Sequence, residues 1–390
     1  MVGGAGLSVD AVQWYLWKRQ LQQAVDSGST AGALSLAKGE AYQAPATREL
    51  GRNADSTLTA TIQSITNPPS SGAYTGDSKA VEVIATTQKA LPFSSIFLSS
   101  APTIRARSVA TSVSDGKYCV IALADTGVGV NIAGSGTANV GCGVASNSQI
   151  QTSIDFDGSS YMNAETYHAV GGIDYASGNV PANADMQAYG LPIGDPLASR
   201  GLTVPASPAS CTASNLTISP SQNVTLSPGR YCNNLTLKGT VTLSPGVYII
   251  DQGALTIESH AHVTGEGVTF VLTGTDVGNV AYPSIAGGAD LSLRAPTAAE
   301  DPYWADILFF QDPIGSTHES YFAGDSNLDL DGYVYMPNGN VRFTGSSGQS
   351  AQCLLLVAYR VTFAGDSSLD NNCTDDSDAG ASGQIVRVVE

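Results

Sequence analysis

Six cysteines are the residues with the plainest chemistry in this chain. No two of them stand in a CxxC spacing, so neither a zinc ribbon nor a thioredoxin-like redox site is indicated. The gaps within successive pairs are 23, 21 and 20 residues. An even number with similar gaps predicts three sequence-local disulfides in an oxidising compartment, and the alternative is six buried free thiols in a cytosolic protein. The expected pairs are Cys119–Cys142, Cys211–Cys232 and Cys353–Cys373.

Acid–base chemistry has few candidates. The four histidines are His168, His260, His262 and His318. Within one strand, Glu258, His260 and His262 would share an outer face, opposite an inward face of Leu255, Ile257, Ala261 and Val263. That outer face is a weak metal candidate beside the simpler alternative of a solvated strand face, and Glu319 beside His318 is weaker still. No G-x-S-x-G, HExxH, P-loop or GxGxxG motif occurs, so we expect a protein that is not an enzyme.

Acidic clusters give a weak calcium candidate. The run Asn327-Leu-Asp-Leu-Asp-Gly332 matches the first half of an EF-hand loop, but position twelve is Asn338 instead of a bidentate glutamate, which excludes an EF-hand. In a strand, Asp329 and Asp331 point to one side. The candidate calcium ligands are Asp325, Asp329 and Asp331, or Asp375, Asp376 and Asp378. The alternative is a solubilising acidic face, and no other cofactor is expected.

The charge of the chain excludes one class of partner. With 34 acidic and 17 basic residues its net charge is −17, so it lacks the basic surface that nucleic acid requires. Residues 1–110 carry nine basic and seven acidic side chains, whereas residues 111–390 carry eight and twenty-seven. This asymmetry predicts a near-neutral base and a strongly acidic body. No stretch of about 18 apolar residues is present, and the opening Met1–Val9 reads as the tail of an apolar segment that begins upstream.

One long helix is expected over residues 7–38. Its apolar stripe recurs at spacings of 3 and 4 residues and ends in small side chains. We expect an assembly or anchoring helix whose stripe is buried against another chain or a membrane. The alternative is an ordinary amphipathic helix packed on its own sheet. The stripe consists of Trp14, Trp17, Leu21, Ala24, Gly28 and Ala31.

Two kinds of β-structure are expected after a connector at 39–56. Strand-like runs at 57–65, 80–86 and 102–110 predict a small antiparallel sheet that packs on the helix. Beyond residue 118, residues 223–231 recur at 240–248, an offset of 17, and residues 322–329 recur at 363–370, an offset of 41. Offsets near 20 residues predict a parallel β-solenoid, with a β-sandwich of local hairpins as the alternative.

The expected fold is therefore α+β, with a long N-terminal helix, a small antiparallel sheet and a mostly-β repetitive region. Four regions follow from this reading. They are an assembly or anchor helix at 1–38, a helix-packed antiparallel sheet at 39–114, a β-rich segment with Cys119 and Cys142 at 115–205, and solenoid-like repeats with an acidic surface at 206–390.

Several motifs resemble a known family. The helix from Asp10 to Asp26 with its small-residue run resembles the N-terminal segment of TadE/TadG-like Flp (tight adherence) pilus-assembly proteins, as do Asn67–Gly72 and Ala80–Val83. The paired-cysteine segment from Cys119 to Asn147 is similar to that of TadG-like members. The runs Leu226–Cys232 and Leu243–Ile249 also match. The resemblance implies an outward-facing protein that a hydrophobic N-terminal helix anchors to the inner membrane.

We therefore expect an extracellular or cell-surface bacterial structural protein, either a filament subunit or a Flp/Tad pilus-associated component, that assembles through its N-terminal helix. Its expected partners are further copies of itself, other pilus proteins and, before processing, the inner membrane. The alternative is a carbohydrate-binding or carbohydrate-active β-solenoid adhesin. A convergent cluster of carboxylates in one groove would favour this alternative.

Overall fold

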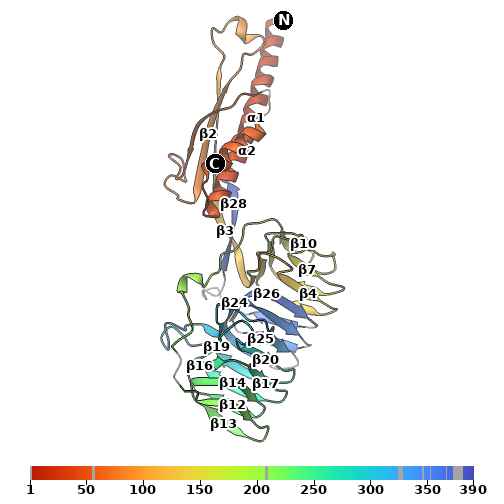
Figure 1. Ribbon diagram of the computed structural model, residues 1–390. Helices are drawn as coiled ribbons and strands as arrows, with labels where there is room; N and C mark the ends of the chain where they lie inside the picture. Colours follow the sequence, from red (N-terminus) through yellow and green to blue (C-terminus); the bar gives the residue numbers. More distant parts are fainter. Residues whose placement is uncertain are drawn as a thin grey trace. The chain divides into compact units, whose positions relative to one another are not determined.

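The chain divides into two compact units (Figure 1). Unit 1 comprises residues 1–115 and 384–390, and unit 2 comprises residues 116–383. Unit 2 is thus inserted into the chain of unit 1, so the four expected regions reduce to two units. The computed structural model describes residues 2–54, 58–206, 210–323, 328–344, 347–351, 353–365, 367–371 and 381–390.

Unit 1 is a helical layer on a small antiparallel sheet. The strands pair in the order β1–β2–β3, as the sequence predicts. The segment at 39–56, expected to be a connector, contains a second helix, which has proline in its first turn and buries Ala46 and Leu50 one turn apart. The elements are α1 (Val2–Ala37), α2 (Gln43–Asn53), β1 (Thr61–Thr66), β2 (Ala80–Gln88), the short 3-10 helix η1 (Ser94–Ile96) and the first part of β3 (Thr103–Ala122).

Helix α1 packs on this sheet through much of its predicted stripe. Trp17, Leu21 and Ala24 belong to one buried cluster with residues of β2 and β3. The small residues have a physical role there, because a Cβ added at Gly32 would lie 2.9 Å from Cγ1 of Val81. The small-residue end of the stripe therefore lets the helix approach its own sheet, which is the alternative that the sequence left open.

A second segment closes unit 1. Residues 384–390 return to β3, where Val109 N donates to the carbonyl of Glu390 at 2.7 Å and Val389 N donates to the carbonyl of Val109 at 2.8 Å. The Arg107 guanidinium links the Glu82 and Glu390 carboxylates, each at 2.6 Å. Burial alone would raise the pKa of Glu82, but hydrogen bonds from Arg107 and Ser70 outweigh it and hold that pKa below its ordinary value.

Unit 2 is built from parallel strands that pair in three runs, called faces A, B and C. Each face is described by its strands in order of pairing. Face A consists of β13 (Asn223–Leu226), β15 (Thr240–Leu243), β18 (His262–Glu266), β21 (Asp290–Arg294) and the start of β24 (Leu328–Thr344). Face B consists of β12 (Ala213–Ile218), β14 (Gly229–Leu237), β17 (Ala254–Ile257), β20 (Tyr282–Ile285), β23 (Ser320–Ala323), β24, β26 (Cys353–Ala364), β4 (Val130–Ala133), β7 (Ile154–Phe156) and β10 (Ile173–Asp174).

Face C shares several strands with face B. The remaining strands are two short pairs and β28. Face C consists of β14, β16 (Gly246–Asp251), β19 (Val268–Thr273), β22 (Ile307–Gln311), β24, β26, the end of β3, β6 (Gly143–Ser146), β9 (Thr166–Ala169) and β11 (Asp185–Gln187). The others are β5 (Thr137–Asn139) with β8 (Tyr161–Asn163), β25 (Ser347–Ala351) with β27 (Ser367–Asn371), and β28 (Ala381–Val388).

These pairings correct the expected architecture. Every strand pair described within unit 2 is parallel, so the β-sandwich of local hairpins is wrong. The eight strands β14, β16, β19, β22, β24, β23, β20 and β17 form a closed parallel ring, because β14 and β24 each continue through a corner and pair on two faces. The expected β-solenoid is therefore replaced, in this part, by a closed eight-strand parallel arrangement. The coarser α+β prediction is confirmed.

The order of the strands in unit 2 differs from their order in the sequence. The segment 116–187 pairs onto β26 through β3 and β4, so it lies beyond residues 353–364 in the stack. The chain then crosses the outside of face C through residues 188–206, which include the 3-10 helix η2 (Ala198–Arg200). Ile193, Leu197 and Leu202 of this crossing pack against outward residues of face C. No local pattern in the sequence indicates this long-range order.

Repeated sequences occupy equivalent places in the core. Asn223 of β13 pairs with Thr240 of β15, which reproduces the offset of 17. Phe322, Phe343 and Phe363 are in register on three neighbouring strands, and their rings stack with centroids 5.0 and 5.7 Å apart. The predicted offset of 41 is thus the distance of two successive strand pairings. Stacked side chains of this kind fill a core that no single turn of chain could bury.

Candidate attachment surface

The first turns of α1 have no cover within their own unit. Trp17 is 7% exposed, but Val12 is 60% exposed and Leu16 and Tyr15 are also exposed. The sheet therefore covers α1 from Trp17 onward only. The expectation that Trp17 and Leu21 are buried against another chain or a membrane is wrong, because they are buried in unit 1, as are Ala24 and Gly28, while Trp14 is exposed and Ala31 is half-buried.

An apolar loop lies beside these turns. It connects β2 to β3 and contains η1, and its Phe97 side chain is 87% exposed. Of the eighteen exposed large hydrophobic side chains among the described residues, ten belong to this end of unit 1. We call them the apolar tip. It consists of Leu7, Val9, Val12, Trp14, Tyr15 and Leu16 of α1 and of Phe93, Ile96, Phe97 and Leu98 of the loop.

One buried carboxylate fastens the loop to the helix. Asp10 is 3% exposed although its neighbours in α1 are exposed. Its carboxylate accepts hydrogen bonds from Phe93 N at 3.1 Å, from Ser94 N and from Ser94 Oγ. Burial alone would raise the pKa of this carboxyl, but these hydrogen bonds outweigh it and hold the pKa below its ordinary value. Asp10 is therefore ionised at neutral pH and positions the loop as an acceptor.

Basic side chains follow the apolar tip along unit 1. Lys89 Nζ lies 5.0 Å from the centre of the Trp17 ring, within the range of a cation–π contact. Lys18 donates to the carbonyl of Arg105, and Arg19 is exposed. The tip thus combines an apolar end with a basic border, in the unit whose charge is close to neutral.

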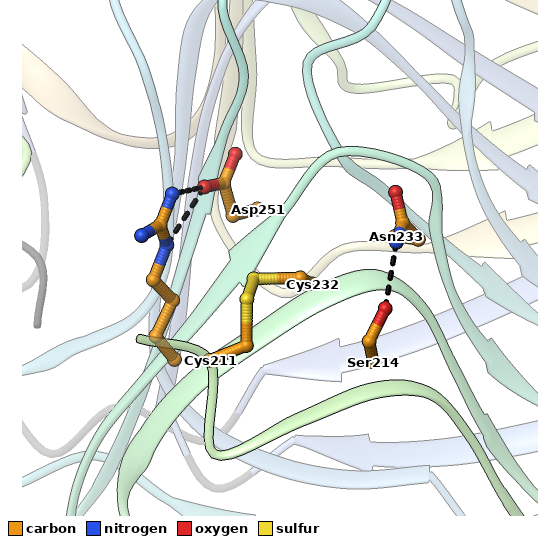
Figure 2. Close-up of a disulfide and its surroundings, with 6 residues drawn as sticks. Cys211, Ser214, Cys232, Asn233 and Asp251 are labelled. Carbon is orange, nitrogen blue, oxygen red and sulfur yellow. Dashed lines mark hydrogen bonds and ion pairs between the residues drawn. A yellow bond between two sulfur atoms is a disulfide. The ribbon is translucent and has the colours of Figure 1, made fainter. Parts of the chain in front are cut away.

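Two predicted disulfides are present in unit 2. Cys119 is bonded to Cys142 and Cys211 to Cys232, at sequence separations of 23 and 21. Figure 2 shows the second of them with Ser214, Asn233 and Asp251 around it. Asn233 Nδ2 donates to Ser214 Oγ at 2.8 Å, and Arg230 Nε donates to Asp251 at 2.8 Å. The third pair, Cys353–Cys373, lies outside the described residues because Cys373 is not among them. Two disulfides are consistent with an extracellular or periplasmic location.

The histidine candidates do not converge. Strand β17 ends at Ile257 and β18 begins at His262, so Glu258 and His260 lie in a turn and the expected shared strand face is wrong. His260 has φ +65°, which ends the strand there. Glu258 pairs with Lys238 at 3.3 Å and His262 with Asp290 at 2.7 Å. The inward residues were predicted correctly, since Leu255, Ile257, Ala261 and Val263 are all buried.

The acidic candidates are only partly placed. Asp329 and Asp331 lie on one side of β24, opposite the buried Leu328 and Leu330, as the alternation predicts. Burial raises the pKa of Asp331, nearby Arg294 lowers it, and Asp329 raises it further. In the described part of the chain, no three His, Cys, Asp or Glu side chains gather closely enough to hold a metal ion. Asp325, Asp375, Asp376 and Asp378 lie outside the described residues.

Sequence reasoning missed the loop and the role of Asp10. The run Leu91-Pro-Phe-Ser-Ser-Ile-Phe-Leu98 is markedly apolar for a connection between strands, and that signal was available. Its pairing with Asp10 was not, because the two are far apart in the sequence. Among the described residues, no helix has both the length and the apolar character needed to cross a membrane. Comparison with family models, curated proteins and solved structures finds no match.

Proposed function

We propose that this protein is an extracellular structural protein without catalytic function, a filament subunit or Flp/Tad pilus-associated surface component, that assembles through the apolar tip. One observation carries the proposal. Ten exposed apolar side chains gather on one end of one unit, and soluble monomers rarely expose apolar surface of this kind without a partner. The resemblance of the helix from Asp10 to Asp26 to pilus-assembly proteins agrees with it.

The expected occupant of the tip is a second copy of this chain. Residues 111–390 carry twenty-seven acidic against eight basic side chains, so two bodies repel one another. Residues 1–110 carry nine basic and seven acidic side chains, so repulsion between copies is weakest where unit 1 meets unit 1. Burial of the tip removes apolar area from water at about 25 cal/mol per Å², which salt does not screen.

Sedimentation velocity at increasing protein concentration tests this proposal. The wild-type protein should associate, and association should persist at high salt. Val12→Asp should abolish it by placing a charge in the contact. Val277→Asp is the matched control, because Val277 is an exposed valine of unit 2 at 49% exposure and lies outside the tip. A monomer at every concentration, or equal association of the two variants, would overturn the proposal.

A further inference from the structure

Face B presents a straight column of outward side chains. The pairings place them in register on ten consecutive strands, and neighbouring parallel strands lie about 4.8 Å apart. At one end the column is made of small hydroxyl side chains. It runs through Thr217, Thr236, Thr256, Ser284, Tyr321, Arg342, Thr362, Asn131, Asp155 and Asp174.

Aromatic rings interrupt this column near its middle. Tyr321 is 37% exposed, and its hydroxyl accepts a hydrogen bond from Thr344 Oγ1 at 2.7 Å. Two residues before Ser284, Tyr282 points to the same side of face B, and the ring of His318 stacks on it with centroids 4.5 Å apart. Rings at the surface of a strand face, held in place by such contacts, form a rigid apolar step among hydroxyl groups.

A charged pair stands beside the rings. Arg342 is in register with Tyr321, and its Nε donates to Glu319 at 2.7 Å. Both side chains are about one-third exposed, at 34% and 36%. The guanidinium and the carboxylate therefore keep donors and acceptors available to solvent while each neutralises the other.

We infer that face B around Tyr321 binds a neutral polysaccharide chain. A sugar ring has an apolar C–H face that packs on an aromatic side chain and a rim of hydroxyls that hydrogen-bond to hydroxyl, guanidinium and carboxylate groups. A polymer with a regular repeat can use donors that recur at every strand, which a single small ligand cannot. The net charge of −17 disfavours polyanionic glycans. This inference goes beyond the proposed assembly function and does not rest on it.

Pull-down with insoluble cellulose, chitin and β-1,3-glucan tests the inference. The wild-type protein should bind at least one of them, and Tyr321→Ala should weaken binding about tenfold, as expected for loss of one aromatic anchor. Tyr321→Phe should retain most of the binding because the ring remains. Arg342→Gln should weaken it less than Tyr321→Ala.

Tyr175→Ala is the matched control. Tyr175 is 44% exposed and follows β10, five strands from β23 on the same face, so its removal should leave binding unchanged. Circular dichroism of each variant shows whether it is folded. Absence of wild-type binding to all three glycans, wild-type affinity in a folded Tyr321→Ala, or binding only to the acidic polysaccharide alginate would each overturn the inference. Failure of the tip variants to affect association would leave it untouched.

Discussion

Units 1 and 2 solve the problem of burial in opposite ways. Unit 2 repeats short parallel strands around a stacked core, has both described disulfides and holds most of the acidic charge. Unit 1 has one helical layer on three strands, is close to neutral and leaves ten apolar side chains uncovered at one end. The difference shows that the self-sufficient unit is the repetitive one, and that the unit with unsatisfied apolar surface is the one suited to contact.

Removing a ring from the core of unit 2 should have the largest effect on stability. Phe343→Ala leaves a cavity between Phe322 and Phe363 and should cost about 3–5 kcal/mol. The loss should be confined to unit 2. Hydrogen exchange followed by mass spectrometry measures this, with protected amides of β2 in unit 1 as the internal reference. Equal loss of protection in both units would show that they do not unfold separately.

Removing the Cys211–Cys232 disulfide should cost somewhat less. Serine at both positions frees a loop of 21 residues in the unfolded chain, and the chain-entropy estimate for this loop is about 3 kcal/mol. Urea unfolding of the variant should show a lower midpoint for unit 2. The wild-type protein in reducing buffer should move in the same direction, and an unchanged midpoint would contradict the prediction.

Acid should distinguish the units through the Arg107 network of unit 1. Glu82 and Glu390 both have a pKa below the ordinary value of 4.5, so their ionised forms stabilise the folded state. A depressed pKa gives stability that is present above the unfolded pKa and lost as the pH falls through the folded pKa. Unit 1 should therefore become less stable below about pH 4.5, as thermal unfolding across pH 2–7 would show. Glu82→Gln should flatten this dependence, and an unchanged pH profile in that variant would contradict it.

The smallest effect on stability is expected at the apolar tip. Phe97→Ser changes a side chain that is 87% exposed, so the free energy of unfolding should change by no more than about 0.5 kcal/mol. Association between copies should nevertheless weaken, because the contact loses its most exposed ring. Thermal melts and sedimentation of the same sample compare the two quantities. A large loss of stability would mean that the tip is part of the core of unit 1.

Local patterns predicted much of the molecule. The stripe of α1, the strands of unit 1, two disulfides and the alternation around Leu255 and Ile257 all depend on neighbours within about 20 residues. The offset of 41 between Phe322 and Phe363 also predicted two strand pairings. What failed depends on distant contacts. The cover that β2 gives to Trp17, the pairing of β26 with β4 and the hydrogen bonds from Ser94 to Asp10 join segments that share no local pattern.

The insertion of unit 2 into unit 1 has a mechanical consequence. Two polypeptide strands cross between the units, one near residue 115 and one near residue 384. A protease that cuts one crossing does not release the body, because the other crossing still joins it covalently. A pulling force on the body is likewise shared by β3 and by the segment 384–390, which hydrogen-bonds to β3 at Val109. For a protein displayed at a surface, this double tether resists both shedding and load.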